Sequence, residues 1–337
     1  MTPARTVPLA IIIPAFRARY FAATLQSLAD QTCREFRVYV ADDASPEPIA
    51  EIAARFAGAM DLVYQRFATN LGQRSLVGHW DRAIKLSGEP YVWLFSDDDL
   101  MGENCVAKFI EDLALVPESR ALRRLDLHRI GADGALLLAE EPFPAQLSGA
   151  DYVRHLLHTR GTTCVMQNMI FPRAIYEGVG SFPDFPGGYC ADSAGWPQLA
   201  REGGVRRLAG AVVRFREHGA SLTVSVPLKL ADWRPLIAAF GQTFWSIRSA
   251  LGEEAAATAQ VRRAEISWFC RWFRYHPREA TRVEVEFAKA EMHQLWPEHP
   301  LAWRIPFWLN RTAARMRRDP LGHRVLGAWR KLGVRIG

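Results

Sequence analysis

The stretch YVWLFSDDDLM at residues 91–101 joins an apolar run to three consecutive acids, Asp97, Asp98 and Asp99. Such a cluster suits a divalent cation, because Mg²⁺ and Mn²⁺ prefer oxygen ligands and commonly bridge one or two carboxylates to substrate phosphates. Two carboxylates about 4 Å apart repel each other by ~1 kcal/mol in water and by ~4 kcal/mol at an effective dielectric of 20. The triplet therefore favours a cation site, although the motif alone is also typical of a solvated helix cap.

A second acidic pair, Asp42 and Asp43, follows the apolar run FRVYVA at residues 36–41. Ligands of open α/β sheets bind at the carboxyl ends of the strands, where such an acid can bond a ribose hydroxyl or a base N–H. The first strand-to-helix turn, residues 13–20, has no G-x-G-x-x-G and no P-loop, and Pro14 stands where a glycine would be needed. A nucleotide diphosphate would lack the usual backbone cradle, which again favours a cation held by carboxylates.

Composition places the chain among ordinary globular proteins. It has 337 residues, 49% of them hydrophobic, which is enough for one large domain or two smaller ones. The five cysteines are scattered and form no C-x-x-C pair, so a disulfide framework or a zinc site is not expected and a reducing cytosol fits better. The apolar run near the N-terminus is too short to span a bilayer and has no signal-peptide cleavage pattern. The sequence predicts a cytoplasmic protein.

The basic character of the chain is concentrated in its tail. The net charge is +6, yet residues 296–337 alone carry nine Arg and Lys against two acids. This distribution argues against a nucleic-acid partner for the rest of the chain. The tail also contains Trp303, Phe307, Trp308 and Trp329, and a basic, aromatic, amphipathic stretch is typical of a membrane-surface segment. We expect peripheral association with the anionic inner face of the cell membrane, or, alternatively, a helical subdomain that packs on the core with its arginines extended to solvent.

Strand-like and helix-like patterns alternate through the first third of the chain. The apolar, β-branched runs predict strands at 9–16, 36–43, 62–67 and 91–99, and apolar residues at helical spacing predict helices at 19–32, 47–58, 73–88 and 104–117. Such alternation predicts a parallel α/β sheet with right-handed crossovers.

The pattern becomes mixed after about residue 120. A hairpin is predicted around 132–134, a helix at 148–159 with Ser148 as its cap, and a Gly/Pro-rich loop at 180–193. A short helix at 194–203 and a strand-like pair at 204–218 follow, and from about residue 228 the chain is mainly helical.

Residues 11–47, IIIPAFRARYFAATLQSLADQTCREFRVYVADDASPE, resemble the opening of family-2 glycosyltransferases of the GT-A fold. That pattern is an apolar strand, Pro-Ala-Tyr-Asn, a helix ending near Gln-Thr, and a strand ending in Asp-Asp-Gly-Ser. The segment NLGQRSLVGHWDRAIKLSGEPYVWLFSDDDLM at 70–101 continues the likeness. The chain departs from the family at Phe16 and Arg17 in place of Tyr-Asn, at Ala44 in place of glycine, and at Ser96 in the first D-x-D position. The resemblance is strong over 7–115, thinner to about 225 and absent from the last hundred residues.

The resemblance implies an α/β fold of the GT-A type, a Rossmann-like, mostly parallel sheet flanked by helices, with a mainly helical C-terminal extension. It divides the chain into a glycosyltransferase domain at 1–225, with a nucleotide-binding half at 1–115 and an acceptor half at 116–225, and a basic, aromatic-rich helical region at 226–337. The implied activity is transfer of a sugar, with inversion, from a UDP-, dTDP- or GDP-linked donor to a saccharide or lipid-linked glycan acceptor. Family members use a divalent metal, Mn²⁺ or Mg²⁺, and bacterial surface polysaccharide or glycolipid assembly is their common setting.

Carried over position by position, the resemblance assigns three groups of residues. Those lining the nucleoside pocket would be Pro14, Ala15, Phe16, Asp42 and Asp43, with Asn70 and Gly72 shaping its floor. Those binding the donor diphosphate and the metal would be Asp97, Asp98 and Asp99, without a choice between Asp98 and Asp99 as the main ligand, together with His218 from the segment RFREHGAS. The catalytic base would be Asp192, which follows the Gly-rich loop.

Local alternatives exist for several of these side chains. Asp192 could simply cap a helix that begins at Ser193, and a lone histidine such as His218 is often structural. Trp196 could form an apolar wall for the acceptor or belong to the core, and His79 is interpreted as a packing or supporting residue. Two other functions compete with sugar transfer. A nucleotidyltransferase would need a Gly-rich phosphate loop with a basic residue early in the chain, and a non-catalytic nucleotide-sugar-binding relative is disfavoured by the intact acids.

Overall fold

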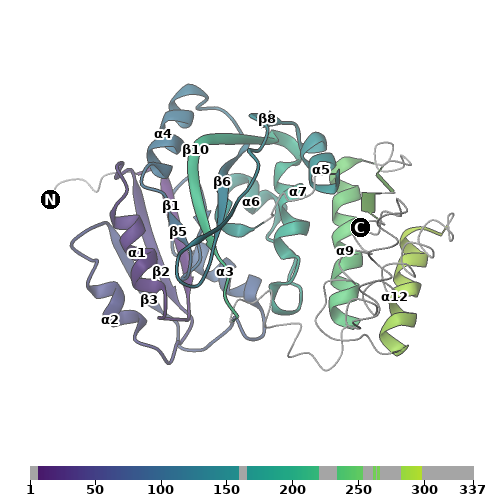
Figure 1. Cartoon of the computed structure of the whole chain (residues 1–337), viewed down its shortest axis with the longest axis horizontal. Coiled ribbons are helices and arrows are strands. Elements are labelled where there is room, and N and C mark those ends of the chain that lie inside the picture. The colour runs from purple at the N-terminus through teal and green to yellow at the C-terminus, as the bar shows by residue number, and fades with distance from the viewer. Residues whose placement is uncertain are drawn as a thin grey trace. The chain divides into compact units, whose positions relative to one another are not determined.

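The computed structural model describes residues 7–158, 165–219, 234–252, 261–262, 264–265 and 282–297. The chain divides into two compact units, Met1–Ser221 and Leu222–Gly337, which are described separately (Figure 1). The first unit carries all the predicted site residues.

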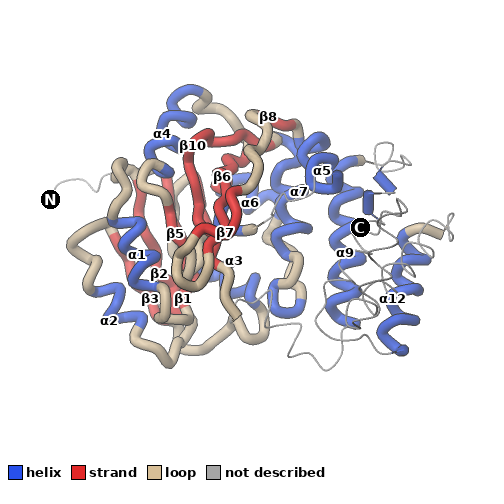
Figure 2. The backbone as a smooth tube through the Cα atoms, in the orientation of Figure 1, coloured by secondary structure: helices blue, strands red, loops and turns tan. Residues whose placement is uncertain are grey.

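Four parallel strands form the first half of the sheet in the order β3-β2-β1-β4. They are β1 (Leu9–Ala15), β2 (Phe36–Asp42), β3 (Leu62–Arg66) and β4 (Tyr91–Leu94). The helices between and after them are α1 (Phe21–Ala29), α2 (Ile49–Ala54), α3 (Leu76–Ile84) and α4 (Cys105–Leu115). The predicted alternation of parallel strands and helices is therefore confirmed, and Figure 2 shows these strands in red beside their helices.

The second half of the sheet is mixed. Strand β9 lies antiparallel between β4 and β6, and β10 runs parallel to β6. Short strands complete it, because β5 and β8 pair antiparallel with β10 and β7 pairs antiparallel with β6. The bounds are β5 (Leu100–Met101), β6 (Leu122–Ile130), β7 (Leu136–Ala139), β8 (Gln146–Leu147), β9 (Met169–Pro172) and β10 (Val205–Arg216).

Three helices and two short 3₁₀ turns accompany this half. They are α5 (Gly149–His158), α6 (Arg173–Val179), α7 (Ala191–Gly203), η1 (Met166–Asn168) and η2 (Pro186–Gly188). The predicted cap of α5 is present, because the Ser148 hydroxyl accepts a hydrogen bond from the backbone N–H of Asp151 at 3.1 Å. The predicted hairpin is also present, with β6 and β7 joined around Gly134.

The core lies on both faces of the sheet, as the continuous apolar run of β1 predicts. Ile11 and Ile13 pack on one face with Phe21 of α1, whereas Ile12 packs on the other with Val77 of α3. All five side chains are buried. Strands β2 and β4 flank β1 in parallel, so the acids that stand at or after their carboxyl ends lie at the same edge of the sheet.

Two predicted strand boundaries differ from the structure. Strand β4 ends at Leu94, so the three acids lie in the loop between β4 and β5 and not within a strand. Residues 204–218 contain the single strand β10 and not a pair of strands, and its register with β6 shifts between Leu208 and Val212. Gly210, with φ of +78°, provides the backbone conformation for this bulge.

The second unit is helical in its described residues, as predicted. Its helices α9 (Arg234–Leu251) and α12 (Arg282–Leu295) pack against each other. Buried Glu265 accepts hydrogen bonds from Arg248, at 2.7 Å, and from the indole N–H of Trp296, at 3.0 Å. None of the described helices is long and apolar enough to cross a bilayer. The basic tail predicted to meet a membrane lies outside the described residues from position 298 onward.

Candidate active site

The turn after β1 is held by the first acid of the triplet. Asp97 Oδ2 accepts hydrogen bonds from the backbone N–H groups of Phe16 and Arg17, both at 2.8 Å. Burial, followed by the charge of neighbouring Asp98, raises the pKa of Asp97 to about 7. The resemblance assigned Phe16 to the nucleoside pocket and Asp97 to the diphosphate and metal group, and the structure brings the two residues into direct contact. One oxygen of Asp97 is thereby committed to the backbone.

The second acid meets the end of β10. Asp98 Oδ2 lies 2.9 Å from Nε2 of His218, and the Arg216 guanidinium donates through Nε to the Asp98 carbonyl at 2.8 Å. The Asp98 side chain is 24% exposed and that of His218 is 5% exposed. The Tyr20 ring lies beside Arg216, the last residue of β10, and beside His218, which follows the strand: its centroid is 4.5 Å from the Arg216 guanidinium and 5.1 Å from the centroid of the His218 ring. These contacts join segments about 120 positions apart, as the resemblance implied.

The third acid is sealed inside the protein. Asp99 is fully buried, and its Oδ1 accepts a hydrogen bond from the backbone N–H of Arg216 at 2.6 Å. Its Oδ2 has no hydrogen-bond partner among the described residues. Burial and the charge of Asp98 raise the pKa of Asp99 well above its usual range. Asp99 therefore holds the end of β10 beside the loop that contains the three acids.

The donor atoms around Asp98 can be tested for a divalent cation. Among the described residues no group of three or more His, Cys, Asp or Glu side chains is arranged to hold a metal ion. Mg²⁺, however, is commonly bound through one or two carboxylates, with water and substrate phosphates completing its shell. Asp98 and His218 supply a partly exposed carboxylate and an imidazole 2.9 Å apart. The donor set fits a cation that shares its coordination with a diphosphate.

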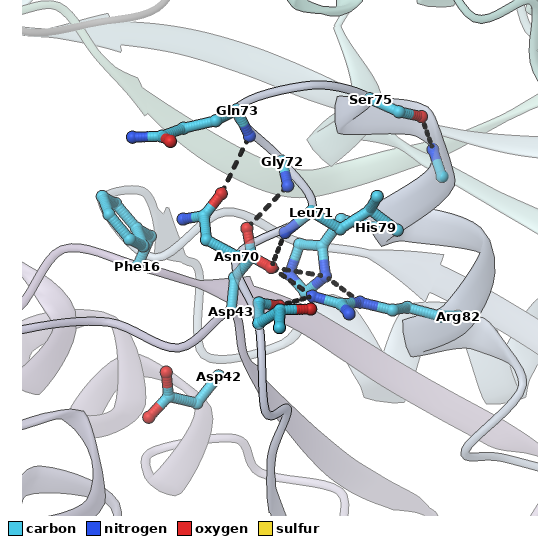
Figure 3. Close-up of polar contacts among 12 residues, drawn as sticks. Phe16, Asp42, Asp43, Asn70, Leu71, Gly72, Gln73, Ser75, His79 and Arg82 are labelled. Atoms are coloured by element: carbon cyan, nitrogen blue, oxygen red, sulfur yellow. Dashed lines mark hydrogen bonds and ion pairs between the residues drawn. The ribbon is translucent and has the colours of Figure 1, made fainter.

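The two acids at the end of β2, Asp42 and Asp43, contact different groups of residues. Asp42 is fully buried, and its carboxylate accepts hydrogen bonds from Arg66 at 2.7 Å and from the backbone N–H of Ser45 at 2.8 Å. Figure 3 shows its side chain directed away from the group around Asp43. Asp42 therefore braces the strand ends of β2 and β3.

Asp43 holds the loop between β3 and α3. Its Oδ1 accepts a hydrogen bond from the backbone N–H of Leu71 and its Oδ2 from that of Gly72, both at 2.8 Å (Figure 3). Asn70 shapes the same loop, because its side-chain oxygen accepts from the backbone N–H of Gln73 at 2.9 Å. The sequence assigned Asp43, Asn70 and Gly72 to one pocket, and in the structure they lie together at the carboxyl end of β2.

Gly72→Ala is expected to damage this loop, because an added Cβ would lie 2.7 Å from Oδ2 of Asp43. Overpacking of this kind costs about 1–3 kcal/mol, and the loop must shift to relieve it. We expect a lower melting temperature and weaker nucleotide binding, measured by thermal unfolding and by titration calorimetry. Gly88→Ala is the matched control, because nothing lies within 4 Å of its added Cβ. Equal behaviour of the two variants would contradict a tight contact between Asp43 and the loop.

Asp192 lies in the first turn of α7. The helix begins at Ala191 after the N-cap residue Cys190, so the alternative in which Asp192 caps a helix from Ser193 is wrong. Asp192 Oδ1 accepts hydrogen bonds from the backbone N–H of Ser193, at 2.6 Å, and from its hydroxyl, at 3.3 Å. Burial raises the pKa of Asp192 to about 6, and the bonds from Ser193 oppose that rise. A carboxylate tuned in this way suits a proton acceptor near neutral pH.

The loop before Asp192 is packed against the start of α3. Gly188 has φ of +69°, and a Cβ there would lie 2.6 Å from the Leu76 side chain at the start of α3. Glycine is therefore required at this position for two reasons, its backbone conformation and the close approach of α3. The Gly-rich loop and the Asp43 loop thus flank the same helix.

The structure also decides between the two alternatives for Trp196 and adds two residues to the site. Trp196 is fully buried against Phe182, with ring centroids 4.9 Å apart, and so belongs to the core and not to an acceptor wall. Sequence reasoning missed Arg66 and Arg82, which contact Asp42 and Asp43. Arg66 lies opposite Asp42 in the register of β2 and β3, a pairing that strand alignment could have suggested, but no local signal points from Arg82 to Asp43.

Comparison with known protein families identifies the part of the chain that contains most of these site residues. Residues 10–116 match the model of glycosyl transferase family 2. No curated protein matches the chain.

Solved structures resemble nearly the whole chain. S. aureus TarS 1-349 aligns with a TM-score of 0.66 at 16% identity, covering 97% of this chain and 92% of that one. The same TarS segment in complex with UDP-GlcNAc aligns with a TM-score of 0.67 at 16% identity and the same coverage. The longer S. aureus TarS structure aligns with a TM-score of 0.66 at 16% identity, over 96% of this chain and 55% of that one. At this identity the likeness concerns the fold. Residues 10–116 of the chain thus match glycosyl transferase family 2, and the described residues have the GT-A-type α/β fold that the motifs predicted.

Proposed function

We propose that this protein transfers a sugar from a nucleotide-diphosphate donor to a hydroxyl group of a glycan acceptor, with inversion at the anomeric carbon. One observation carries the proposal: hydrogen bonds join the turn after β1, the acid triplet and the end of β10 at a single place. The match of residues 10–116 to a glycosyltransferase family supports the proposal that this convergence would form a site for a diphosphate beside a nucleoside pocket.

The donor would lie across the carboxyl ends of β1, β2 and β4. Its nucleoside would contact Pro14 and the loop that Asp43 holds, with Asn70 and Gly72 beneath it. The complex of TarS with UDP-GlcNAc supports a uridine nucleotide as the first donor class to test, with dTDP- and GDP-sugars as the others. Asp42, being fully buried, would act through the strand ends and not through direct contact.

Asp98 and His218 would hold the divalent cation, Mn²⁺ or Mg²⁺. When bound, such a cation stabilises the negative charge that builds on a leaving diphosphate. Asp98 is suited to this role because its carboxylate is partly exposed and has a partner donor at 2.9 Å, whereas Asp97 is engaged by two amides and Asp99 is fully buried. Asp97 would keep the Phe16 turn in place around the donor.

Asp192 would act as the base. Its carboxylate would accept the proton of the acceptor hydroxyl as that oxygen bonds to the anomeric carbon and the bond from this carbon to the diphosphate breaks. One displacement from the opposite face gives inversion and needs no covalent glycosyl-enzyme. We further propose an acceptor in bacterial surface polysaccharide or glycolipid assembly, with the basic tail at an anionic membrane surface, a setting that the tail's composition supports.

The pH dependence of turnover is expected to report Asp192. Because burial raises the pKa of this acid to about 6, kcat should fall about tenfold per pH unit below pH 6 as the carboxylate becomes protonated. Ser193→Ala should move this limb to higher pH, since the variant removes a hydrogen bond that favours the charged carboxylate. Profiles of kcat between pH 4.5 and 8.5 provide the measurement. A kcat that does not change between pH 7 and pH 5 would contradict the assignment of Asp192 as the base.

An assay with UDP-, dTDP- and GDP-sugars, each with Mn²⁺ and with a chelator, tests the proposed function. We expect release of a nucleoside diphosphate with one donor class, faster in the presence of a glycan acceptor. A nucleotidyltransferase would instead transfer the nucleoside monophosphate of the donor and release a sugar 1-phosphate. A non-catalytic relative would bind a nucleotide sugar without turnover. Absence of both binding and turnover with every donor would overturn the proposal.

A further inference from the structure

The environment of Asp43 contains two residues that neither the motifs nor the proposed mechanism uses, Arg82 and His79 of α3. Arg82 Nη2 contacts Asp43 Oδ1 and donates to the Thr69 carbonyl at 3.0 Å, while Nε donates to Nδ1 of His79 at 3.0 Å (Figure 3). The guanidinium carbon lies 3.9 Å from the centroid of the Phe67 ring. The Arg82 guanidinium is therefore held by polar contacts at its edge and by the Phe67 ring against its face.

His79 must be neutral to make this contact. Its Nδ1 accepts the hydrogen bond from Arg82, which assigns the ring proton to Nε2. The side chain is buried, and burial lowers the pKa of His79 to about 4 although the charge of Asp43 opposes that change. The imidazole thus serves as a permanent acceptor that orients the guanidinium, and it does not titrate near neutral pH.

Asp43 transmits this arrangement to the backbone. The carboxylate is buried and uses both oxygens, bonding Leu71 and Gly72 through their amides and Arg82 through its guanidinium. Without Arg82 a buried charge would lose its cationic partner, and the loop would lose its fixed geometry.

We propose that Arg82 and His79 are positioning residues for the donor: they orient Asp43 so that the backbone of residues 70–72 keeps the shape that receives the nucleoside. The inference rests on the proposed function and names residues that touch neither donor nor acceptor. Its consequence is specific, since the shape of a binding loop affects donor affinity more than the chemical step.

Two substitutions of His79 separate orientation from packing. His79→Asn keeps an acceptor near the position of Nδ1, whereas His79→Leu fills the space without one. We expect His79→Asn to retain donor KM within about threefold and His79→Leu to raise it about tenfold, with kcat nearly unchanged in both. Arg82→Lys keeps the charge but not the guanidinium fork, and it should also raise KM about tenfold. A packing role predicts the opposite order, with leucine tolerated better than asparagine.

Amide hydrogen exchange of the ligand-free proteins tests the same contacts without turnover. In the wild type and in His79→Asn the amides of Leu71 and Gly72 should be protected, and in His79→Leu and Arg82→Lys they should exchange at least tenfold faster. Equal exchange in all four proteins, or equal KM for the two His79 variants, would overturn the inference. If wild-type protein bound no UDP, dTDP or GDP while the exchange order held, the proposed function would fail and the positioning of the loop would stand. If His79→Leu did not fold, the comparison of Arg82→Lys with the wild type would decide.

Discussion

Asp192→Asn is expected to abolish sugar transfer while leaving donor binding close to that of the wild type. The amide has nearly the same shape as the carboxylate and can still accept from Ser193, but it cannot take the proton of the acceptor hydroxyl. Loss of a general base typically lowers the rate by about 10²–10⁴-fold. Single-turnover assays should show this loss in the chemical step, and calorimetry should show an unchanged Kd for the nucleotide sugar.

Asp184→Asn is the matched control for this variant. Asp184 lies in the same Gly/Pro-rich segment but is exposed, and no hydrogen bond to its side chain appears in the described part of the chain. It should keep wild-type turnover. Near-normal transfer by Asp192→Asn would show that another group accepts the proton.

Asp98→Asn is expected to have the second large effect, on the use of the cation. The substitution removes a partly exposed charge of the triplet and takes from His218 its carboxylate partner Asp98. Loss of an outer-sphere partner alone typically costs a metal site 10–100-fold in affinity, so loss of a ligand should raise the Mn²⁺ concentration for half-maximal transfer by at least about 100-fold. Titration of the transfer rate with Mn²⁺ at saturating donor measures this shift.

Glu103→Gln controls for the loss of one negative charge near the triplet. Glu103 is exposed shortly after the acids and hydrogen-bonds Thr32 through its carbonyl, which the substitution keeps. Its Mn²⁺ dependence should equal that of the wild type. If Asp98→Asn left the Mn²⁺ dependence unchanged, Asp98 would not be a ligand of the cation. If Glu103→Gln shifted the Mn²⁺ dependence by a similar amount, the effect of Asp98→Asn would come from the loss of negative charge alone.

The parallel half of the sheet could be predicted from sequence because its signals are local. Strand β1 is buried on both faces, and its sequence is an unbroken apolar run. Helix α3 is preceded by the N-cap residue Ser75, whose hydroxyl accepts a hydrogen bond from the Gly78 N–H at 2.8 Å. Strand β9 was not predicted because MIFP at 169–172 is only four residues long. It is a strand because it pairs with β4 on one side and with β6 on the other. Residues 204–218 predicted two strands because Gly210 resembles a turn, whereas pairing with β6 keeps the chain extended on both sides of a bulge.

The roles of the acids could not be separated from sequence, since each role depends on partners far along the chain. Asp97, Asp98 and Asp99 are neighbours of one type, yet the first meets the turn after β1, the second meets His218 and the third meets the backbone of Arg216. These partners lie 80–120 positions away in the sequence. The motif therefore predicted a cation site but not the ligand within it.

Titration calorimetry of wild-type protein with a nucleoside diphosphate and with the matching nucleoside, each with Mn²⁺ and with a chelator, tests the central claim most directly. That claim is that Asp98 and His218 bind the donor's diphosphate through a divalent cation. UDP and uridine form the first pair, followed by the pair whose sugar proves active in transfer. We predict that Mn²⁺ strengthens diphosphate binding at least tenfold, or ~1.4 kcal/mol, and leaves nucleoside binding unchanged. Diphosphate affinity that is the same with Mn²⁺ and with the chelator, or an equal gain for the nucleoside, would contradict the account.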